Sequence, residues 1–210
     1  MPTETMRHVL PKILAHPSQY QHQFFTFIET GTGNGDTAAW ASNLFDNVYT
    51  IEARMSKHNH AALKYGDIPN IDFLPGDSRI LLPLLLEGLT VPCIFWLDAH
   101  FVGNLQIAYQ LNDECPLREE LETIVAHSWE RRLSHLIFID DAELFTGDFT
   151  HPDPRKDMTQ WPSLEDILVL VDGMFGSYQY CIFYGNIILY PDSMDEAVEA
   201  AIAESPTWAR

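Results

Sequence analysis

The chain has 210 residues, of which 46% are hydrophobic and 20% are charged, a composition that suits one globular domain and argues against disorder. Acidic residues outnumber basic ones by 30 to 12, which gives a formal net charge of −18 at pH 7. So acidic a chain repels a phosphate backbone and offers no basic stripe to hold one. Nucleic acid is therefore not expected as a partner.

We expect a single domain over residues 1–210, in which residues 1–23 form a helical N-terminal extension. The segment Met1–His22 mixes charged residues and histidines without a continuous apolar run. It therefore resembles neither a secretory signal nor a membrane span. The cysteines are few, odd in number and far apart, which favours reduced thiols, so we expect a cytoplasmic protein.

The first half of the chain alternates strand patterns with helix patterns. An apolar run that ends at Thr30 predicts the first strand, and three alternate glycines predict a tight turn that opens into a helix. Ser78 is expected to cap a helix that continues through Leu86, with Pro83 as a local disturbance. The other predicted elements are strands at Asn47–Glu52, Ile71–Ser78 and Cys93–Asp98 and a helix at Ser56–Tyr65.

The second half continues this alternation and then ends in a hairpin. Because strands alternate with helices, we expect a doubly wound, mostly parallel α/β sheet of seven strands, with a C-terminal antiparallel hairpin. A ligand crevice should lie at the carboxyl ends of its strands. The predicted elements are helices from Pro116 to Val125, Ser163–Val171 and Met194–Ala203, strands at His135–Asp141, Tyr178–Tyr184 and Asn186–Tyr190, and a long loop at Phe145–Pro162.

The turn that contains Gly31, Gly33 and Gly35 is the first candidate binding element. Glycine tolerates positive φ angles and lets the backbone approach a ligand, so this turn can expose amide groups to a nucleotide-like molecule. Glu52 ends the second strand about 20 residues after the first glycine, where a carboxylate commonly holds ribose hydroxyls. The alternative for Glu52 is a solvated acid at a strand end.

Three carboxylates follow the fourth and fifth predicted strands. Asp98 ends one strand, and Asp140 with Asp141 ends the other, so the parallel topology brings them to one edge of the sheet. Oxygen ligands without neighbouring thiols suit Mg²⁺, and three such carboxylates without a cation would repel one another. The alternative for the adjacent pair is an exposed turn, where acids are common.

Three segments resemble the class I S-adenosylmethionine-dependent methyltransferases, namely Glu29-Thr-Gly-Thr-Gly-Asn-Gly, Ile51-Glu52 and Gly76-Asp77-Ser78. The resemblance spans roughly residues 24–190 and implies an S-adenosylmethionine site. It implies that the glycine turn, with Glu29, supports the methionine part of the donor. It also implies that Glu52 holds the ribose and that Asp77, with Ser78, approaches the adenine amino group.

A nicotinamide-dependent dehydrogenase is the rival interpretation of the glycine turn. Short-chain dehydrogenases use a Tyr-x-x-x-Lys pair, and none of the eight tyrosines in this chain has a lysine four residues later. Other dehydrogenases remain open. The shortness of the chain and its closing hairpin favour the methyltransferase.

The carboxylates resemble those of the metal-dependent branch of this family, which includes the catechol and macrocin types. The resemblance implies that Asp98, Asp140 and Asp141 ligate magnesium and that the enzyme methylates a hydroxyl group. The expected acceptor is a small hydroxylated molecule, such as a sugar or a natural-product intermediate. Asp98 thus counts as both a metal ligand and a catalytic residue.

His100, two residues after Asp98, is the candidate general base, because imidazole titrates near neutrality. Its alternative role is to form a local hydrogen bond or to support a metal ligand. Trp161, at the end of the long loop, is placed to reach a substrate. Two other functions remain open, a metal-independent N-methyltransferase of the same fold and a donor-binding module without catalysis. Association of identical chains is also left open, and no membrane partner is expected.

Overall fold

The structure is a computed structural model that describes residues 4–17, 24–100, 115–147 and 161–205. Most of the predicted loop Phe145–Pro162 lies outside these described residues, and so does part of the predicted extension 1–23. Within that extension, Glu4–Ala15 forms helix α1.

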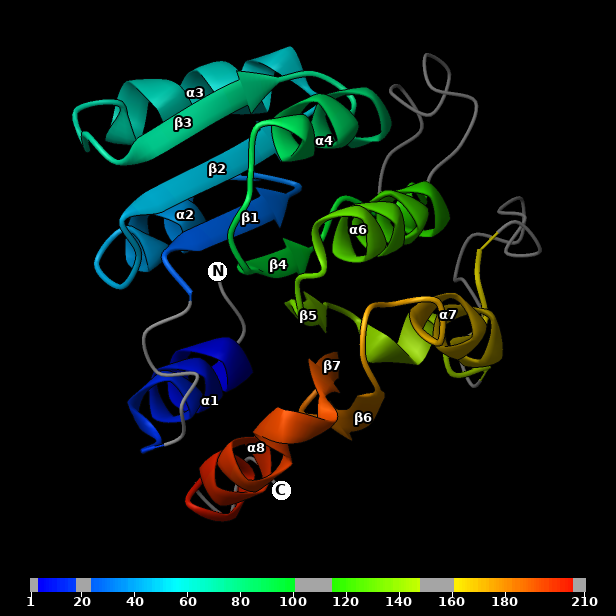
Figure 1. Ribbon diagram of the computed structural model, residues 1–210. Coiled ribbons are helices and arrows are strands. Elements are labelled where there is room, and N and C mark those ends of the chain that lie inside the picture. Colours follow the sequence, from blue (N-terminus) through cyan, green and yellow to red (C-terminus); the bar gives the residue numbers. More distant parts are fainter. Residues whose placement is uncertain (1–3, 18–23, 101–114, 148–160, 206–210) are drawn as a thin grey trace.

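Seven strands form one sheet in the order β3-β2-β1-β4-β5-β7-β6 (Figure 1). Strands β1 to β5 run parallel, β7 is antiparallel to β5, and β6 is antiparallel to β7. The predicted fold class, a mostly parallel sheet with a C-terminal antiparallel hairpin, is confirmed. The strands are β1 (Thr26–Thr30), β2 (Asn47–Glu52), β3 (Ile71–Pro75), β4 (Cys93–Leu97), β5 (Leu136–Ile139), β6 (Tyr178–Phe183) and β7 (Asn186–Pro191).

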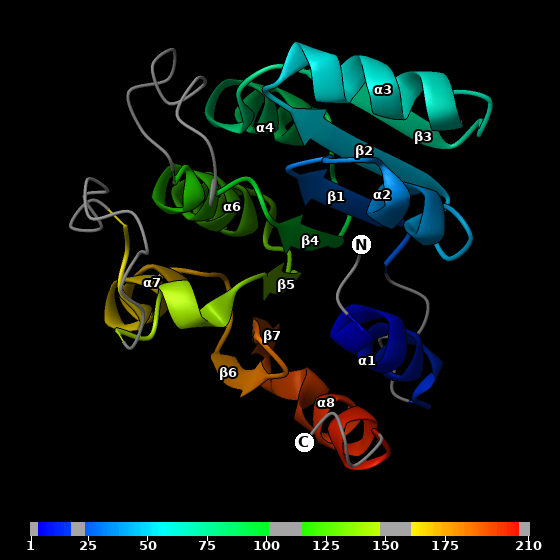
Figure 2. The same cartoon turned by 180° about the vertical axis from the view of Figure 1, so that it is seen from behind.

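Helices cover both faces of this sheet. Figures 1 and 2 show α4, α6 and α7 on one face, and α1, α2, α3 and α8 on the other. No helix within the described ranges is long and apolar enough to cross a bilayer. The helices after α1 are α2 (Asp36–Ala41), α3 (Met55–Tyr65), α4 (Ser78–Glu87), α6 (Leu117–Arg131), α7 (Leu164–Val171) and α8 (Asp195–Ala203).

The central strands are apolar along their whole length because both of their faces are covered. All five residues of β4 and all four of β5 are buried. Strands that lie between two layers of helices lose the alternation of apolar and polar residues that half-exposed strands show. This explains why their sequences read as continuous apolar runs.

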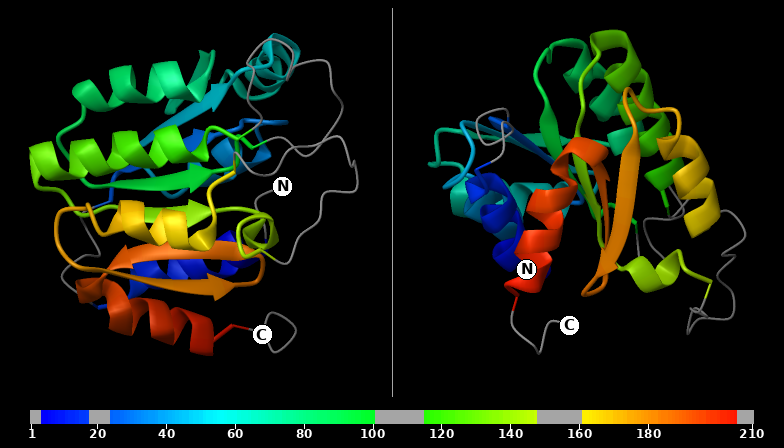
Figure 3. Two further views of the ribbon diagram at one scale, coloured as in Figure 1. Left: turned by 90° about the vertical axis from the view of Figure 1, so that its right-hand side faces the viewer. Right: turned by 60° about the horizontal axis from the view of Figure 1, so that its bottom comes forward.

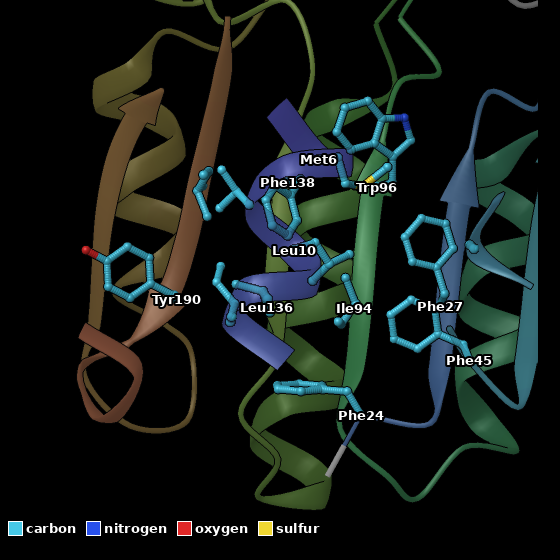
Figure 4. Close-up of a cluster of buried hydrophobic side chains, with 14 of the residues drawn as sticks. Met6, Leu10, Phe24, Phe27, Phe45, Ile94, Trp96, Leu136, Phe138 and Tyr190 are labelled. Carbon is cyan, nitrogen blue, oxygen red and sulfur yellow. The ribbon is translucent and has the colours of Figure 1, made fainter. Parts of the chain in front are cut away.

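Aromatic side chains fill the core between the sheet and the layer of α1 and α8 (Figure 4). Phe27 stacks on Phe45 with ring centroids 5.4 Å apart, and Trp96 packs on Phe138 at 6.4 Å. Each such side chain contributes about 1.5–3 kcal/mol by its removal from water. This layer therefore fixes the position of β1 and β4, whose carboxyl ends carry the candidate site.

Helix α1 is an integral part of this core. Met6, Val9, Leu10 and Ile13 are buried, and their spacing places them on one helical face. The helix packs against α8, its neighbour in Figure 3, so the first and last described helices cover the same face of the sheet. The N-terminal segment thus contributes to the domain core.

The start of α4 corrects one detail of the prediction. The sequence favours Ser78 as the capping residue, but the cap is Asp77, whose side chain accepts a hydrogen bond from the amide of Arg79. Ser78 is instead the first helical residue and is buried. An aspartate is as good a cap as serine, so the cap and the helix start both lie one residue earlier than predicted. The helix then continues through Pro83 to Glu87.

Candidate functional site

The candidate site lies at the carboxyl ends of the parallel strands. Strand β1 lies between β2 and β4, and Thr30 at its end pairs with Ile51 and Leu97. The carboxyl ends of these three strands therefore lie side by side. Gly31, Glu52 and Asp98 stand at these ends, and Asp140 follows β5 in the same row. The sheet therefore brings the glycine turn and the predicted acids to one edge, as expected for an open α/β sheet.

The glycine turn between β1 and α2 is held by its own amide groups. Gly31 and Thr32 both donate to the carbonyl oxygen of Ile51, at 2.9 and 3.2 Å. Gly33 donates to Oε2 of Glu52 at 3.0 Å. The glycine pattern predicts a turn that exposes its amides to a ligand, but these three amides are bonded within the protein. Hydrogen bonds within the protein therefore hold the turn in shape, and a ligand would contact its outer surface without receiving bonds from these three amides.

Two of the three turn glycines are required by packing. Gly31, Gly33 and Gly35 have φ angles of 85°, 56° and 80°, in the region that favours glycine. A Cβ atom on Gly31 would lie 2.1 Å from the carbonyl oxygen of Asp98, and one on Gly35 would lie 3.0 Å from Cβ of Ala61. On Gly33, the nearest atom would be the carbonyl oxygen of Gly31, at 3.9 Å. Only Gly33 leaves open space for a ligand.

Glu29 lies beneath the turn, in the core of the sheet. Its Oε2 atom accepts a hydrogen bond of 2.5 Å from the hydroxyl of Thr50. Because the single proton of that hydroxyl is used there, Thr32 must donate in the 2.6 Å contact between its own hydroxyl and that of Thr50. Burial raises the pKa of Glu29 to about 8, and this hydrogen bond opposes the rise. Glu29 thus supports the turn from below through two threonines.

Glu52 closes the turn from the side. Its Oε2 accepts from the amide of Gly33, and its Oε1 accepts from the amide of Arg54 at 2.8 Å. The residue is 8% exposed. A carboxylate offers about four lone-pair sites, so each oxygen of Glu52 keeps capacity for one further donor. That capacity, at the end of β2, suits a pair of ribose hydroxyls.

Asp77, expected to approach an adenine amino group, is paired with Arg79. The guanidinium donates from Nη2 to Oδ2 at 2.7 Å and from Nε to both carboxylate oxygens at 3.1 Å. Together with its role as the α4 cap, this pairing occupies most of the acceptor capacity of Asp77. Ser78 lies buried beside it at the start of the helix. The structure therefore places both residues at the expected edge, with the carboxylate of Asp77 paired to the guanidinium of Arg79.

Asp98, His100 and Asp141 form a cluster beside the turn. One ligand atom of each lies within 4.8 Å of those of the other two. Nε2 of His100 lies 3.3 Å from Oδ2 of Asp141, whose side chain is 45% exposed. Asp141 has φ 51° and ψ 52°, so a left-handed backbone turns its side chain back toward β4. Two residues predicted as metal ligands and the predicted base are thus brought together.

Asp140, the third predicted ligand, has a different partner. Its Oδ1 accepts a hydrogen bond of 2.7 Å from Nδ2 of Asn186, the first residue of β7. Burial raises the pKa of Asp140 to about 6, and the charge of Asp141 adds to the rise. Asp140 therefore lies at the same edge as Asp98 but outside the cluster of three. Asn186 had no signal in the sequence, because its role depends on the pairing of β5 with β7.

His100 is enclosed by aromatic rings. Its ring makes edge-on contacts with Phe145 at 5.5 Å and with Trp161 at 5.8 Å between centroids. Burial would lower the pKa of His100, but the hydrogen bond to Asp141 and the nearby carboxylate charges raise it above its usual value. Trp161, expected at a substrate, thus forms part of the wall that covers the imidazole.

The charges of the cluster affect one another. Burial raises the pKa of Asp98 to about 7; the charge of His100 lowers it, and the charges of Asp140 and Asp141 raise it further. The hydrogen bond from His100 holds the pKa of Asp141 below its usual value, although partial burial opposes this. A bound cation would relieve the repulsion among these carboxylates.

Glu120 is a buried acid near the site that was not predicted from the sequence. It belongs to the first turn of α6 and is 1% exposed. Burial raises its pKa to about 7, while the hydroxyls of Ser78 and Thr30 lie close enough to lower it. Neither Oε1 of Glu120 nor Oγ1 of Thr30 makes a hydrogen bond of good geometry. The available signal was its spacing, because it falls on the apolar face of its helix, three residues after Leu117.

The residues at this edge fit an adenosyl donor and a divalent cation, the two groups predicted from the sequence. The open space at Gly33 and the remaining acceptor capacity of Glu52 suit an adenosyl donor. The sulfonium and ammonium charges of S-adenosylmethionine also complement the surrounding acids. The oxygen and nitrogen donors of the Asp98 cluster suit a divalent cation.

Neither a family model nor a curated protein matches this chain. Solved structures do match. An O-methyltransferase from Bacillus cereus, solved with S-adenosylhomocysteine, is 14% identical with a TM-score of 0.54, and the match covers 91% of this chain and 82% of that one.

Two further solved structures have the same arrangement. A precorrin-6y C5,15-methyltransferase from Geobacter metallireducens is 11% identical with a TM-score of 0.51, over 90% of this chain and 88% of that one. A Streptococcus mutans protein solved with S-adenosylhomocysteine is 13% identical with a TM-score of 0.50, over 90% and 97%. At such identities these likenesses show a shared fold, the Rossmann-like fold of S-adenosylmethionine-dependent methyltransferases.

Proposed function

We propose that this protein is an S-adenosylmethionine-dependent methyltransferase. One observation supports the proposal most strongly. A glycine turn, the carboxylate of Glu52 that accepts from its Gly33 amide, and the cluster of Asp98, His100 and Asp141 lie together at one edge of the sheet. The shared fold supports it, because the solved structures with this fold include enzymes that bind S-adenosylhomocysteine. Fold alone does not establish an activity, so the site residues carry the argument.

On the donor side, each predicted residue has a distinct task. S-adenosylmethionine supplies an electrophilic methyl group on a positively charged sulfur. Glu52 accepts the ribose hydroxyls, and Gly33 provides the surface against which the methionine part lies. Glu29 holds the turn through Thr50 and does not contact the ligand, because it is buried beneath it. Ser78 and Asp77 flank the adenine.

On the acceptor side, we propose methylation of a hydroxyl group of a small molecule, such as a sugar or a natural-product intermediate. The acids at this edge would hold a divalent cation, which supplies a positive charge that favours a deprotonated hydroxyl. Asp98 would orient the acceptor, together with Asp140 and Asp141. His100 would take the proton or support the cation, and its enclosure by Phe145 and Trp161 excludes water from that step.

A second candidate is a metal-independent N-methyltransferase of the same fold. The same carboxylates favour it, because they would attract a protonated amine as well as a cation. A donor-binding module without catalysis is the third possibility. Donor binding with no turnover across hydroxylated and amine acceptors would support that third reading. Methyl transfer to an amine that persists in chelator would support the second.

Calorimetry with S-adenosylmethionine and S-adenosylhomocysteine tests the donor site. We expect Glu52→Gln to weaken binding by about tenfold or more, because ribose hydroxyls lose a charged acceptor. Glu130→Gln is the matched control, since Glu130 is exposed on α6. Absence of any heat or fluorescence change with the wild-type protein would refute the proposal.

Transfer of a labelled methyl group then tests the acceptor side. The assay compares hydroxylated and amine acceptors, each with and without a chelator. Transfer to hydroxyl groups that stops in chelator is the expected result. Equal transfer in chelator would reject the cation, and transfer to amines alone would select the N-methyltransferase.

A further inference from the structure

The cluster beside the glycine turn differs from the set of ligands expected from the sequence. Its members are Asp98, His100 and Asp141, and their ligand atoms lie within 4.8 Å of one another. Asp140 is directed to Asn186 instead. An imidazole nitrogen thus occupies the place where a third carboxylate oxygen was expected.

We infer that Asp98, His100 and Asp141 ligate one divalent ion of the first transition row, with His100 as the nitrogen ligand. This inference rests on the proposed function, because it names the ion that the acceptor side of that site would take. It also gives His100 a different role from the expected one, since a nitrogen bound to a metal ion cannot act as the general base.

The carboxylate of Asp98 is the second observation that points to a ligand. Within the described ranges no donor group forms a hydrogen bond with this carboxylate, although the residue is only partly exposed. It faces one imidazole and two further carboxylates, whose charges act on it directly. A partly buried charge without a hydrogen-bond partner is costly, and a cation would supply the missing partner.

One ion would reach all three side chains after a small adjustment of the cluster. Two ligand atoms on the same ion, each at about 2.1 Å, lie no more than about 4.2 Å apart. The cluster is close to this limit, and Nε2 of His100 already lies 3.3 Å from Oδ2 of Asp141. The side chain of Asp141 is 45% exposed, so it has room to adjust. Three protein ligands leave positions open for water or for an acceptor oxygen, as catalytic sites require.

The donor set decides the kind of ion. Mg²⁺ prefers oxygen ligands in near-ideal octahedral geometry, whereas an imidazole nitrogen is a better ligand for divalent ions of the first transition row. His100 is also held rigidly, because Phe145 and Trp161 pack against its ring. A fixed imidazole is part of what makes such a site selective.

Titration of the purified, chelator-treated chain with Mn²⁺, Co²⁺ and Mg²⁺ tests this inference without donor or acceptor. Free Mn²⁺ is counted by electron paramagnetic resonance, and Co²⁺ uptake is read as quenching of tryptophan fluorescence. Trp161 lies 5.8 Å from His100, so it is the expected reporter. Trp161→Phe keeps an aromatic ring in that position and should remove most of the quenching.

We expect Mn²⁺ and Co²⁺ to bind at least about tenfold more tightly than Mg²⁺, and His100→Gln to remove most of this preference. Asp141→Asn, at the exposed ligand, should weaken binding without disturbing the core. Asp140→Asn removes the adjacent carboxylate, which Asn186 holds outside the cluster, and should reduce metal affinity much less than Asp141→Asn does. Circular dichroism on each variant separates loss of the ion from loss of the fold.

Three results would overturn the inference. They are equal affinity for Mg²⁺ and Mn²⁺, wild-type affinity in His100→Gln, and a loss in Asp140→Asn as large as that in Asp141→Asn. Binding of S-adenosylmethionine is measured separately on the same protein. Donor binding without metal uptake would refute the inference alone, whereas metal uptake without donor binding would refute the proposed function alone.

Discussion

The backbone of Gly31 lies so close to that of Asp98 that a Cβ atom on Gly31 would be 2.1 Å from the Asp98 carbonyl oxygen. This contact joins the turn on the donor side to the strand end on the acceptor side. In a methyltransferase the two reacting atoms must be held in line, and small displacements reduce the rate strongly. The absence of a side chain at one glycine thus fixes the separation of the two halves of the proposed site.

Gly31→Ala should therefore destabilise the whole protein. The substitution combines a left-handed backbone with a clash against backbone atoms, for a total cost of about 2–5 kcal/mol. Gly185→Ala is the matched control, because Gly185 has φ 77° but open space around the position of a Cβ atom. Unfolding in urea compares the two. Equal free energies of unfolding in both variants would show that the clash is relieved at no cost.

Gly33→Ala should weaken donor binding while leaving the fold intact. The added Cβ meets no protein atom closer than 3.9 Å, so only the left-handed backbone opposes it. It does fill the open space assigned to the donor. We expect the dissociation constant of S-adenosylmethionine to rise about tenfold, which corresponds to about 1.4 kcal/mol. The melting temperature should fall no further than in Gly185→Ala, and an unchanged dissociation constant would place the donor elsewhere.

Much of the fold could be predicted from sequence because its signals are local. The buried strand β4, the glycine turn and the acids at strand ends depend on patterns within a few residues. Burial on both faces of the sheet makes the apolar runs unambiguous. The carboxyl edge then follows from topology, and with it the meeting of Asp98 with the residues after β5.

The details of the site could not be predicted because they depend on long-range contacts. Asp140 and Asp141 are adjacent and chemically identical, yet Asn186 on β7 holds the first and His100 the second. No local sequence pattern predicts the left-handed backbone conformation of Asp141. The burial of Glu120 could not be predicted for a related reason, since charged residues on a helix are normally exposed.

Glu29 makes the stability of the protein depend on pH between about 4.5 and 8. Its pKa is raised to about 8 by burial, from an ordinary value of 4.5, so the folded state binds its proton more tightly than the unfolded state does. The resulting stability is present at low pH and is lost as the pH rises toward 8, by about 1.4 kcal/mol per pH unit for this one group. Glu29→Gln should remove this dependence, because glutamine stays neutral.

Urea unfolding of wild type and Glu29→Gln at several pH values between 5 and 9 measures this difference. The variant should gain stability relative to wild type as the pH rises, and Glu130→Gln should follow wild type throughout. Parallel curves for wild type and Glu29→Gln would mean that Glu29 ionises in the folded protein at its ordinary pKa. Donor binding should survive in the variant, because Glu29 acts from beneath the turn.

Two buried histidines, His127 and His135, lie at the opposite end of the sheet and make the folded protein less stable in acid. Nδ1 of His135 accepts from the amide of Cys93 at 3.1 Å, so its Nε2 must carry the proton that it donates to Nδ1 of His127. His127 in turn donates from Nε2 to the carbonyl oxygen of Leu89 at 3.0 Å. The chain of hydrogen bonds therefore requires both imidazoles to be neutral.

Protonation of His135 would break this chain. Burial lowers the pKa of His135 from 6.5 to about 3, and a positive charge on His127 would lower it further. Below pH 6.5, His135 therefore binds a proton in the unfolded state but stays neutral in the folded state. The stability that neutral His135 contributes is fully present above pH 6.5, and it falls by about 1.4 kcal/mol per pH unit toward pH 3.

His135→Asn should make the protein less sensitive to acid. The asparagine oxygen can accept the Cys93 amide in place of Nδ1, and the side chain takes up no proton in this range. The variant should be less stable than wild type at pH 7, because the contact with His127 is lost, but the gap should narrow as the pH falls to 4. His60→Asn, at an exposed histidine of α3, is the control and should keep the wild-type dependence. A gap between wild type and His135→Asn that stays constant from pH 7 to 4 would show that His135 is not held neutral by the fold.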